Sequence, residues 1–246
     1  MGRARSRVGP LAGALGVLAL ANVSNNRIAR RWAPLTSAAA TAALLAVARR
    51  EGLAWAELGF SGEGRGARLG GALAAGVAAV YAAGVACPRT RPVFLDERSL
   101  ALSRARLLEE ALVQVPVGTV LLEEVAFRGV LPELLGRSLP ARTAEGAAAL
   151  LFGLWHVLPA MDMARANPAL GHLASGSPVV SAGRVVAGTV VSTTLAGLLF
   201  QELRRRGGLL APALTHVATN SFGYVAARAA RRLDEARRAR SSRPTP

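Results

Sequence analysis

The sequence contains no lysine, a single cysteine and few aromatic residues. All of its basic charge comes from arginine, and a joint bias to Arg, Ala and Gly is explained better by a GC-rich genome than by a nucleic-acid-binding surface. Aromatic residues make up only 4% of the chain, which leaves few platforms on which bases could stack. With Cys87 alone, no disulfide can form within the chain. We therefore expect no nucleic-acid partner and no disulfide framework.

Charge is scarce and unevenly distributed. Of the 246 residues, 52% are hydrophobic and 18% charged, and the mean hydropathy is +0.33. The charged residues fall into short runs between apolar blocks, and arginines flank those blocks as they do in membrane proteins. The composition predicts an all-α, polytopic transmembrane helical bundle in the plasma membrane, with the lipid bilayer as its surroundings.

The apolar blocks predict about seven spans. They cover residues 8–23, 34–48, 69–87, 107–131, 144–160, 179–200 and 209–227. The first block follows three arginines and contains Ala19-Leu20-Ala21, so it resembles a cleavable signal, but we favour an uncleaved span. Pro116 predicts a bend in the fourth span.

No linker or internal repeat divides the chain into independent domains. The N-terminal region, residues 1–106, holds about three spans and no motif, and residues 107–227 hold all the candidate catalytic residues. Residues 228–246 form a basic tail. If the spans alternate in direction, this arginine-rich tail lies outside the cell, which conflicts with the usual charge bias.

The fourth span carries two adjacent carboxylates and an arginine, Glu123, Glu124 and Arg128. An ionisable side chain in a membrane helix costs about 2.5–3.5 kcal/mol on insertion scales, so it marks a functional site by default. Glu124 precedes Arg128 by four residues, the favourable order for a helical ion pair. Glu123 points about 100° away round the helix and has no partner in its own segment. A structural ion-pair network is the alternative interpretation.

Two further polar groups lie at similar depth in the fifth and seventh spans. Counted from the membrane face that these spans share, Glu123, His156 and His216 lie roughly 10–18 Å deep at ~1.5 Å per residue. Asn220 follows His216 by one helical turn and shares its side of the helix. We therefore expect an active-site cavity between spans four, five and seven. Arginines in the adjoining loops predict that this cavity opens toward the cytoplasm through the shared face.

Three ordered motifs resemble those of a known family. Glu-Glu-x-x-x-Arg at Glu123, Phe-x-x-x-His ending at His156 and His-x-x-x-Asn from His216 to Asn220 are similar to the motifs of the CPBP family. This family, also called Abi, comprises intramembrane CAAX-processing and bacteriocin-processing endopeptidases. The resemblance covers about the second half of the chain. It implies hydrolysis of a peptide bond in a membrane-embedded or membrane-delivered polypeptide.

The resemblance also implies roles for the motif residues. Glu123 and His156 would activate water, since a carboxylate in a wet cavity can act as general base. His216 and Asn220 would donate to the oxyanion, and Glu124 with Arg128 would support the helix. A zinc enzyme is also compatible with the residues, because His156, His216 and Glu123 would supply three protein ligands. No His-Glu-x-x-His is present, so no cofactor is certain and Zn²⁺ stays open.

Other functions remain open on the same scaffold. A non-catalytic membrane adaptor or bacteriocin self-immunity protein would not need all four of Glu123, His156, His216 and Asn220, so their presence favours the enzyme. A proton-coupled transporter using Glu123 is disfavoured, because the chain lacks paired broken helices in two matching halves. Phe152 and Trp155 are interpreted as packing or interface residues. His172 is given no role.

Overall fold

Helices make up most of the part that the structure describes. The computed structural model describes residues 8–166 and 182–241, and within these ranges it contains helices, turns and no strand. Three helices are long and apolar enough to cross a membrane, namely Glu63–Ala86, Ala141–Arg165 and Gly183–Gly207. The prediction of an all-helical fold is thereby confirmed for the described residues, and the three candidate spans agree with a helical membrane protein.

The long helical segments occupy the predicted apolar blocks. They are α1 (Val8–Val23), α2 (Ala33–Arg50), α3 (Glu63–Ala86), a broken helix of α5 (Arg104–Glu109), η4 (Glu110–Val120), α6 (Leu121–Glu124), η5 (Val125–Val130) and α7 (Leu131–Gly136), then α8 (Ala141–Trp155), α9 (Val157–Ala166), α11 (Ala182–Gly207) and α12 (Leu210–Ser241). Short connecting elements are η1 (Ser24–Ile28), η2 (Arg30–Trp32), η3 (Arg91–Phe94) and α4 (Glu97–Leu100). The start of the predicted sixth span, residues 179–181, lies outside the described residues.

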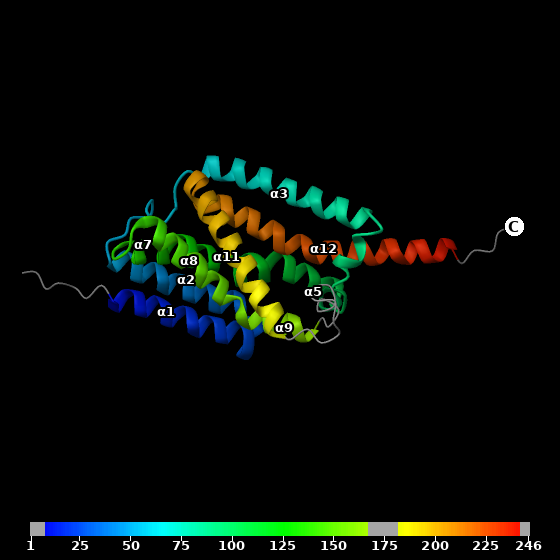
Figure 1. Cartoon of the computed structure of the whole chain (residues 1–246), viewed down its shortest axis with the longest axis horizontal. Coiled ribbons are helices and arrows are strands. Elements are labelled where there is room, and N and C mark those ends of the chain that lie inside the picture. Colours follow the sequence, from blue (N-terminus) through cyan, green and yellow to red (C-terminus); the bar gives the residue numbers. More distant parts are fainter. Residues whose placement is uncertain (1–7, 167–181, 242–246) are drawn as a thin grey trace, which may run out of the picture.

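The helices form two groups that α11 links. In Figure 1, α1, α2, α7 and α8 lie together at the lower left, and α3 runs beside α12 above them. α11 packs against α8 and α9 and meets α12 at their shared turn. The last turns of α12 project beyond the other helices at the right. The broken helix from α5 to α7 packs against α2 and α12, and Glu123 within it is buried.

The broken helix departs from regular α geometry on both sides of Glu123. Pro116 lies inside η4, a π-helical stretch, and η5 has the same wide turns. Proline has no backbone N–H and clashes with the preceding turn of a regular helix. Here wider turns accommodate it, and π segments of this kind often occur at functional sites. The predicted bend therefore takes the form of a widened helix.

Glycine allows α3 to approach α12 closely. A Cβ atom added at Gly70 would lie 2.8 Å from the carbonyl oxygen of Ala211, whereas one added at the neighbouring Gly71 would meet nothing within 4 Å. Small residues at such spacings let membrane helices pack backbone to backbone. The turn from α11 to α12 contains Gly208 at φ +62°, a left-handed conformation that glycine adopts without strain. These positions fix α12 against the N-terminal region.

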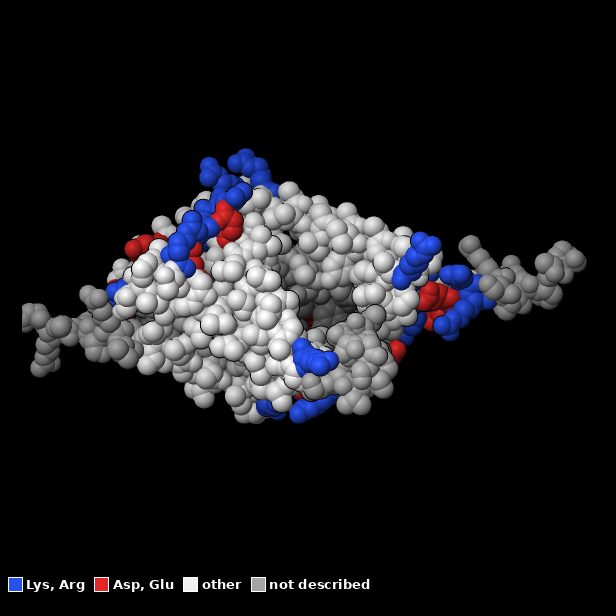
Figure 2. Space-filling model, in the orientation of Figure 1, with Lys and Arg blue, Asp and Glu red and all other residues white. Residues whose placement is uncertain are grey.

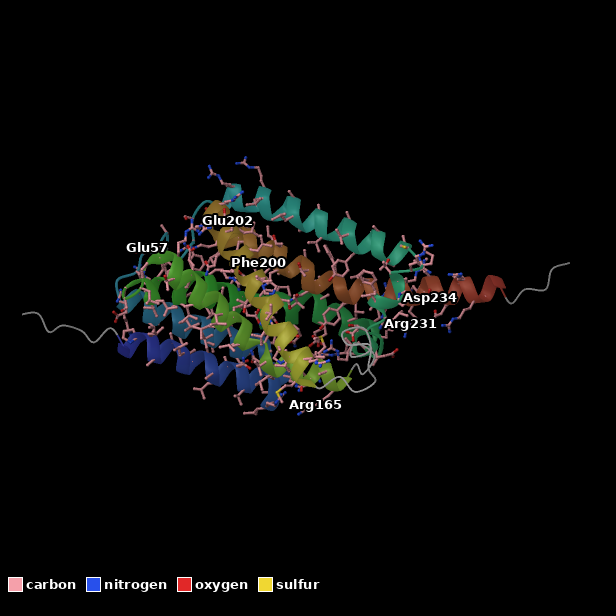
Figure 3. All side chains as sticks on the ribbon, in the orientation of Figure 1. Glu57, Arg165, Phe200, Glu202, Arg231 and Asp234 are labelled. Atoms are coloured by element: carbon pink, nitrogen blue, oxygen red, sulfur yellow. The ribbon has the colours of Figure 1, made fainter. Side chains whose placement is uncertain are left out.

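Charged side chains gather toward the ends of the molecule. Figure 2 shows arginines and acids mainly at the upper left, at the right and along the lower rim, with a broad uncharged surface between them. Figure 3 shows Glu57 and Glu202 at one end, Arg231 and Asp234 at the other, and Phe200 between them. This distribution suits a bundle that crosses a bilayer.

The loop between α2 and α3 closes the end of the bundle at which α7, α8, α11 and α12 meet. Leu58 in this loop is fully buried, and the backbone N–H of Leu209 donates to the carbonyl of Gly59 over 2.8 Å. Arg204 forms an ion pair with Glu133 across the same end at 3.0 Å. Packing of this loop therefore covers the face through which the sequence predicted that the cavity would open.

Candidate active site

Glu123 and Glu124 lie in the short regular segment α6, between the two π-helical stretches. Their exposed fractions are 4% and 2%, so both carboxylates are removed from bulk solvent. Buried carboxylates are costly unless hydrogen bonds or charges compensate them. The two side chains have different partners, so we describe the surroundings of Glu124 and of Glu123 separately.

Glu124 faces Arg128, as the four-residue spacing predicts. Arg128 Nη1 lies 3.3 Å from Glu124 Oε1, and the arginine side chain is 1% exposed. Its guanidinium lies over the rings of Phe152 and Phe200, 3.9 and 4.9 Å from their centres. An arginine between aromatic faces gains cation–π attraction without water. These contacts fit the predicted supporting role of Glu124 and Arg128, and they give Phe152 a role beyond simple packing.

His216 lies between the two glutamates. Its Nδ1 is 2.7 Å from Glu124 Oε1, and because a carboxylate accepts, the ring donates this hydrogen bond. Its Nε2 lies 3.7 Å from Glu123 Oε2. The sequence placed His216 beside the carboxylates but did not predict direct contact with both. His216 is therefore the histidine whose ring lies next to the Glu123 carboxylate.

Trp155 is a partner of Glu123 that the motifs did not reveal. Its indole N–H donates to Glu123 Oε1 over 2.8 Å. The Asn22 side chain in turn donates to the Trp155 carbonyl over 2.9 Å. The prediction that Trp155 only packs or lies at an interface is incomplete, because a tryptophan has one polar group and here that group binds a candidate catalytic residue. Its position directly before His156 was the available signal.

His156 occupies the break between α8 and α9. Its Nδ1 lies 2.8 Å from the carbonyl oxygen of Phe152, which can only accept, so Nδ1 carries the proton. Nε2 is therefore the ring nitrogen that can take part in a reaction, because the hydrogen bond of one ring nitrogen decides the tautomer of the ring. Asn220 lies one turn after His216 on α12 and is partly buried. Both residues line the same pocket as Glu123.

This pocket has a volume of about 990 Å³. Helices α6, α8, α9, α11 and α12 all contribute to its wall, and the candidate catalytic residues that line it are Glu123, His156, His216 and Asn220. At its outer end it is lined by charged residues, namely Arg30, Arg98, Asp162 and Arg165. Arg165 lies at the lower edge in Figure 3, away from Glu57, and Figure 2 shows a hollow near the middle of the same face. The pocket thus opens at the opposite end from the one that the sequence predicted.

Several buried polar atoms of the site have no hydrogen-bond partner. They are Glu123 Oε2, Glu124 Oε2 and both terminal nitrogens of Arg128. Buried polar groups are nearly always satisfied by protein or ordered water, so unpaired atoms beside a pocket of this size indicate room for water or substrate. Of these atoms, Glu123 Oε2 belongs to a side chain that lines the pocket.

The donor groups do not form a metal site. Among residues 8–166 and 182–241, no three His, Cys, Asp or Glu side chains converge in the way that a metal ion requires. His216 donates Nδ1–H to Glu124 and His156 donates Nδ1–H to the Phe152 carbonyl, which leaves Nε2 as the possible ligand atom of each ring. Within the described residues, His156, His216 and Glu123 do not gather closely enough to form the predicted zinc set.

Close packing of α8 on α11 holds the second motif in place. A Cβ atom at Gly153 would lie 2.7 Å from the carbonyl oxygen of Val190, so only glycine allows this approach. The adjacent Phe152 contacts His156 with ring centres 4.6 Å apart. The backbone around the second motif is thereby fixed on both sides of Trp155.

The same stretch of sequence matches a family model. Residues 110–222, a little under half of the chain, match the model described as type II CAAX prenyl endopeptidase Rce1-like. Residues 110–222 are thus similar to this family. The match contains Glu123, His156, His216 and Asn220, so the resemblance drawn from the three motifs is confirmed. No curated protein and no solved structure matches the chain. The Rce1-like match supports a protease with a peptide substrate at a membrane.

Proposed function

We propose that the protein is an intramembrane endopeptidase in which Glu123 activates the water that attacks the peptide bond. The observation that carries this proposal is the environment of Glu123: a buried carboxylate on the pocket wall, held by a tryptophan N–H, with its second oxygen unpaired. Glu124 also keeps one unpaired oxygen, but it pairs with Arg128 and does not line the pocket. A carboxylate with a free oxygen beside a wet pocket can accept a proton from water.

The roles of the other residues follow from their positions. A water molecule bound to Glu123 Oε2 can also reach His216 Nε2, 3.7 Å from that oxygen, so we assign the water-binding pair to Glu123 and His216. Asn220, one turn further along α12, keeps its predicted role as donor to the oxyanion that develops on the scissile carbonyl. His156 carries protons through Nε2, while Glu124 and Arg128 orient His216 and the helix.

The two carboxylates therefore divide the work. Glu124 accepts from His216 Nδ1 and orients the ring, much as a buried carboxylate orients histidine in other hydrolases. Glu123 meets the reacting water. In this mechanism no metal is needed, because a buried general base and an amide donor supply the two functions that hydrolysis requires.

We further propose that all seven long helical segments cross the plasma membrane, with the pocket open to the cytoplasm. Arginines of η1, η2, α5 and the C-terminal part of α12 lie at the pocket end. Placing that end in the cytoplasm satisfies the positive-inside rule and removes the conflict that the basic tail created. It reverses the orientation predicted from the loops near Arg137 and Arg142. Reporter fusions after Ser241 and in the loop at Gly136 test it.

The substrate is a membrane-embedded or membrane-delivered polypeptide. The Rce1-like match favours an endopeptidase over the rival function, a non-catalytic adaptor or self-immunity protein on the same scaffold. The two functions separate in cells that express either the wild type or Glu123→Ala. An endopeptidase leaves uncleaved precursors in the membrane peptides of the variant. Equal peptide sets, with the two proteins at equal abundance, favour the adaptor.

A further inference from the structure

The widened segment η4 takes its backbone hydrogen bonds one residue further back than a regular helix does. The N–H of Leu121 donates to the carbonyl of Pro116, five residues earlier, whereas the N–H of Val125 donates to that of Leu121, four residues earlier. A regular α-helix uses the four-residue spacing throughout. The hydrogen-bond register therefore changes between these two N–H groups, in the turn that contains Glu123.

This change of register leaves one carbonyl of the turn without a helical donor. Within this fully described stretch, three N–H groups, those of residues 122–124, lie between the two bonds and face four carbonyls, those of residues 117–120. Gly118 is one of the four. The hydroxyl of Ser37, from α2, donates to the Gly118 carbonyl over 2.5 Å, and Asn25 donates to the Ser37 oxygen over 2.9 Å. Ser37 is fully buried, so it supplies the extra donor away from water.

Pro116 removes a second helical donor. Proline has no backbone N–H, and at the spacing of η4 that group would have donated to the carbonyl of Ala111, five residues earlier. The hydroxyl of Ser221, from α12, donates to this carbonyl over 2.7 Å. Ser221 is 8% exposed and directly follows Asn220. A side chain of α12 thus takes the place of the missing N–H.

The two hydroxyls bear on the site through the backbone of the widened helix. At the spacing of η4, the N–H that would reach the Gly118 carbonyl is that of Glu123 itself. Ser37 therefore binds the helix where the register of the Glu123 turn is decided. A π turn takes more residues than an α turn, so regular geometry here would rotate Glu123 around the helix and away from Trp155 and His216.

We propose that Ser37 and Ser221 are positioning residues, which hold the wide turns of η4 and thereby keep the Glu123 carboxylate against Trp155 and His216. Their effect on cleavage rests on the proposed function, whereas their effect on the position of Glu123 does not. Ser37 lies outside the residues that match the family model, so the N-terminal region contributes to the site as well.

The indole N–H resonance of Trp155 reports the position of Glu123 without any cleavage. A charge-assisted hydrogen bond to a carboxylate moves the resonance of the donated proton downfield. The full-length protein in detergent contains three tryptophans, and Trp155→Phe assigns the signal. In Ser37→Ala and in Ser221→Ala we expect this signal to move upfield, while the Trp55 signal stays in place and shows that the protein is folded. A variant that leaves the Trp155 signal unmoved excludes its serine from the proposal.

Two further variants separate the hydrogen bond of Ser37 from its packing. Thr41→Val is the matched control, because Thr41 lies one turn later on α2, is 6% exposed and has no hydrogen-bond partner for its hydroxyl among the described residues. It should leave the Trp155 signal unchanged. Ser37→Cys fills the same space with a weaker donor, so its signal should lie between those of the wild type and Ser37→Ala. A shift in Thr41→Val as large as that in Ser37→Ala would assign the effect to packing of α2.

Pro116 provides a specific test of Ser221. Pro116→Ala returns a backbone N–H that can donate to Ala111 at the spacing of η4. Ser221→Ala should therefore move the Trp155 signal less in this background than in the wild type, since two groups that serve one acceptor are not additive. Equal shifts in both backgrounds would show that Ser221 does not replace the proline N–H, and would overturn this role.

Kinetics of the protein with Glu123 intact separates failure of this inference from failure of the proposed function. The probe is a fluorogenic peptide ending in S-farnesyl cysteine and three further residues, chosen from the family match. Ser37→Ala and Ser221→Ala should lower kcat about tenfold at an unchanged KM, the effect of one lost buried hydrogen bond. If the wild type cuts the peptide and both variants keep its kcat, the endopeptidase stands and the positioning role is wrong. If the Trp155 signal moves as expected but the wild type does not cut the peptide, the positions stand and the endopeptidase is wrong for this substrate.

Discussion

Glu123 and Glu124 are adjacent and both buried, yet the surroundings of their carboxylates differ. Glu124 meets Arg128 at 3.3 Å and the N–H of His216 at 2.7 Å, so cationic and polar partners surround it. Glu123 receives one hydrogen bond from Trp155 and has no arginine partner, and of the two carboxylates it is the one that lines the pocket, although each keeps one unpaired oxygen. The difference separates a charge that maintains structure from a charge that is kept available for chemistry.

This comparison explains why two acids occur side by side. One helical step of about 100° turns Glu124 toward Arg128 and Glu123 toward the pocket. His216 contacts both, so the ring that Glu124 orients is also the ring beside the reacting carboxylate. Variants on the two sides should therefore fail in different ways.

Loss of the Glu123 charge has the largest expected effect. Glu123→Gln keeps size and hydrogen bonding but removes basicity, so hydrolysis should fall by ~10²–10⁴, the usual contribution of a general base. Turnover of a confirmed peptide substrate and the thermal midpoint of the purified protein are measured together. Stability and substrate binding should be unchanged. Near-normal hydrolysis by Glu123→Gln would show that another group is the base.

Loss of Arg128 should instead act on folding. Arg128→Ala leaves Glu124 as a buried charge without its cation, which typically costs about 3–5 kcal/mol. Denaturant unfolding in detergent measures this cost, and Glu124→Gln should be destabilising for the same reason. Arg206→Ala, at a side chain that is 67% exposed, is the control and should change stability little. A stable Arg128→Ala protein that has lost activity would assign Arg128 to the reaction.

The oxyanion side of the pocket comes next in size. Asn220→Ala should reduce turnover by roughly 10²–10³, the cost of removing one donor to the developing oxyanion. Burst-phase and steady-state kinetics should show a lower kcat at an unchanged KM. If KM alone rises, Asn220 contacts the substrate in its ground state and the assignment of the donor changes.

Removal of the Trp155 N–H should have a smaller effect. Trp155→Phe preserves an aromatic ring but takes away one hydrogen bond to a charged group, so we expect about tenfold lower kcat with little change in stability. Trp55→Phe, at a partly exposed ring far from the pocket, serves as the control. Activity equal to that of the wild type would mean that the pocket wall alone positions Glu123.

A chelator should have the smallest effect of all. Because His156, His216 and Glu123 do not converge as ligands, we expect hydrolysis to continue in protein treated with EDTA and dialysed against metal-free buffer. Metal content by mass spectrometry is the control. Activity that disappears and returns with Zn²⁺ would replace the metal-free mechanism with the zinc mechanism.

Depth along a helix can be predicted from sequence, whereas the direction of a side chain around that helix is harder to predict. Counting residues from the shared face correctly brought Glu123 and His216 to one level, and the four-residue spacing correctly paired Glu124 with Arg128. Contact of His216 with both glutamates depends on how α12 is rotated about its own axis. Close packing of α12 against a glycine of α3 fixes that rotation. No local pattern encodes that rotation.

Contacts distant in sequence account for the remaining differences. The hydrogen bond from Trp155 to Glu123 joins residues on different helices, and the closing of one end depends on a loop whose Leu58 packs into the core. The pocket therefore opens at the other end of the bundle from the one that loop charges predicted. The family motifs identified the residues of the site, and tertiary packing decides how they meet.

The ion pair between Glu124 and Arg128 also bears on the order in which the chain is made. Both residues belong to one helix, so their charges can neutralise each other as soon as that segment leaves the ribosome and enters the membrane. His216 lies 92 residues further along than Glu124, so it does not exist yet at that moment. A nascent chain that stops before α12 holds both glutamates but lacks His216 and Asn220. The protease can therefore become active only after its last described helix has been synthesised and packed.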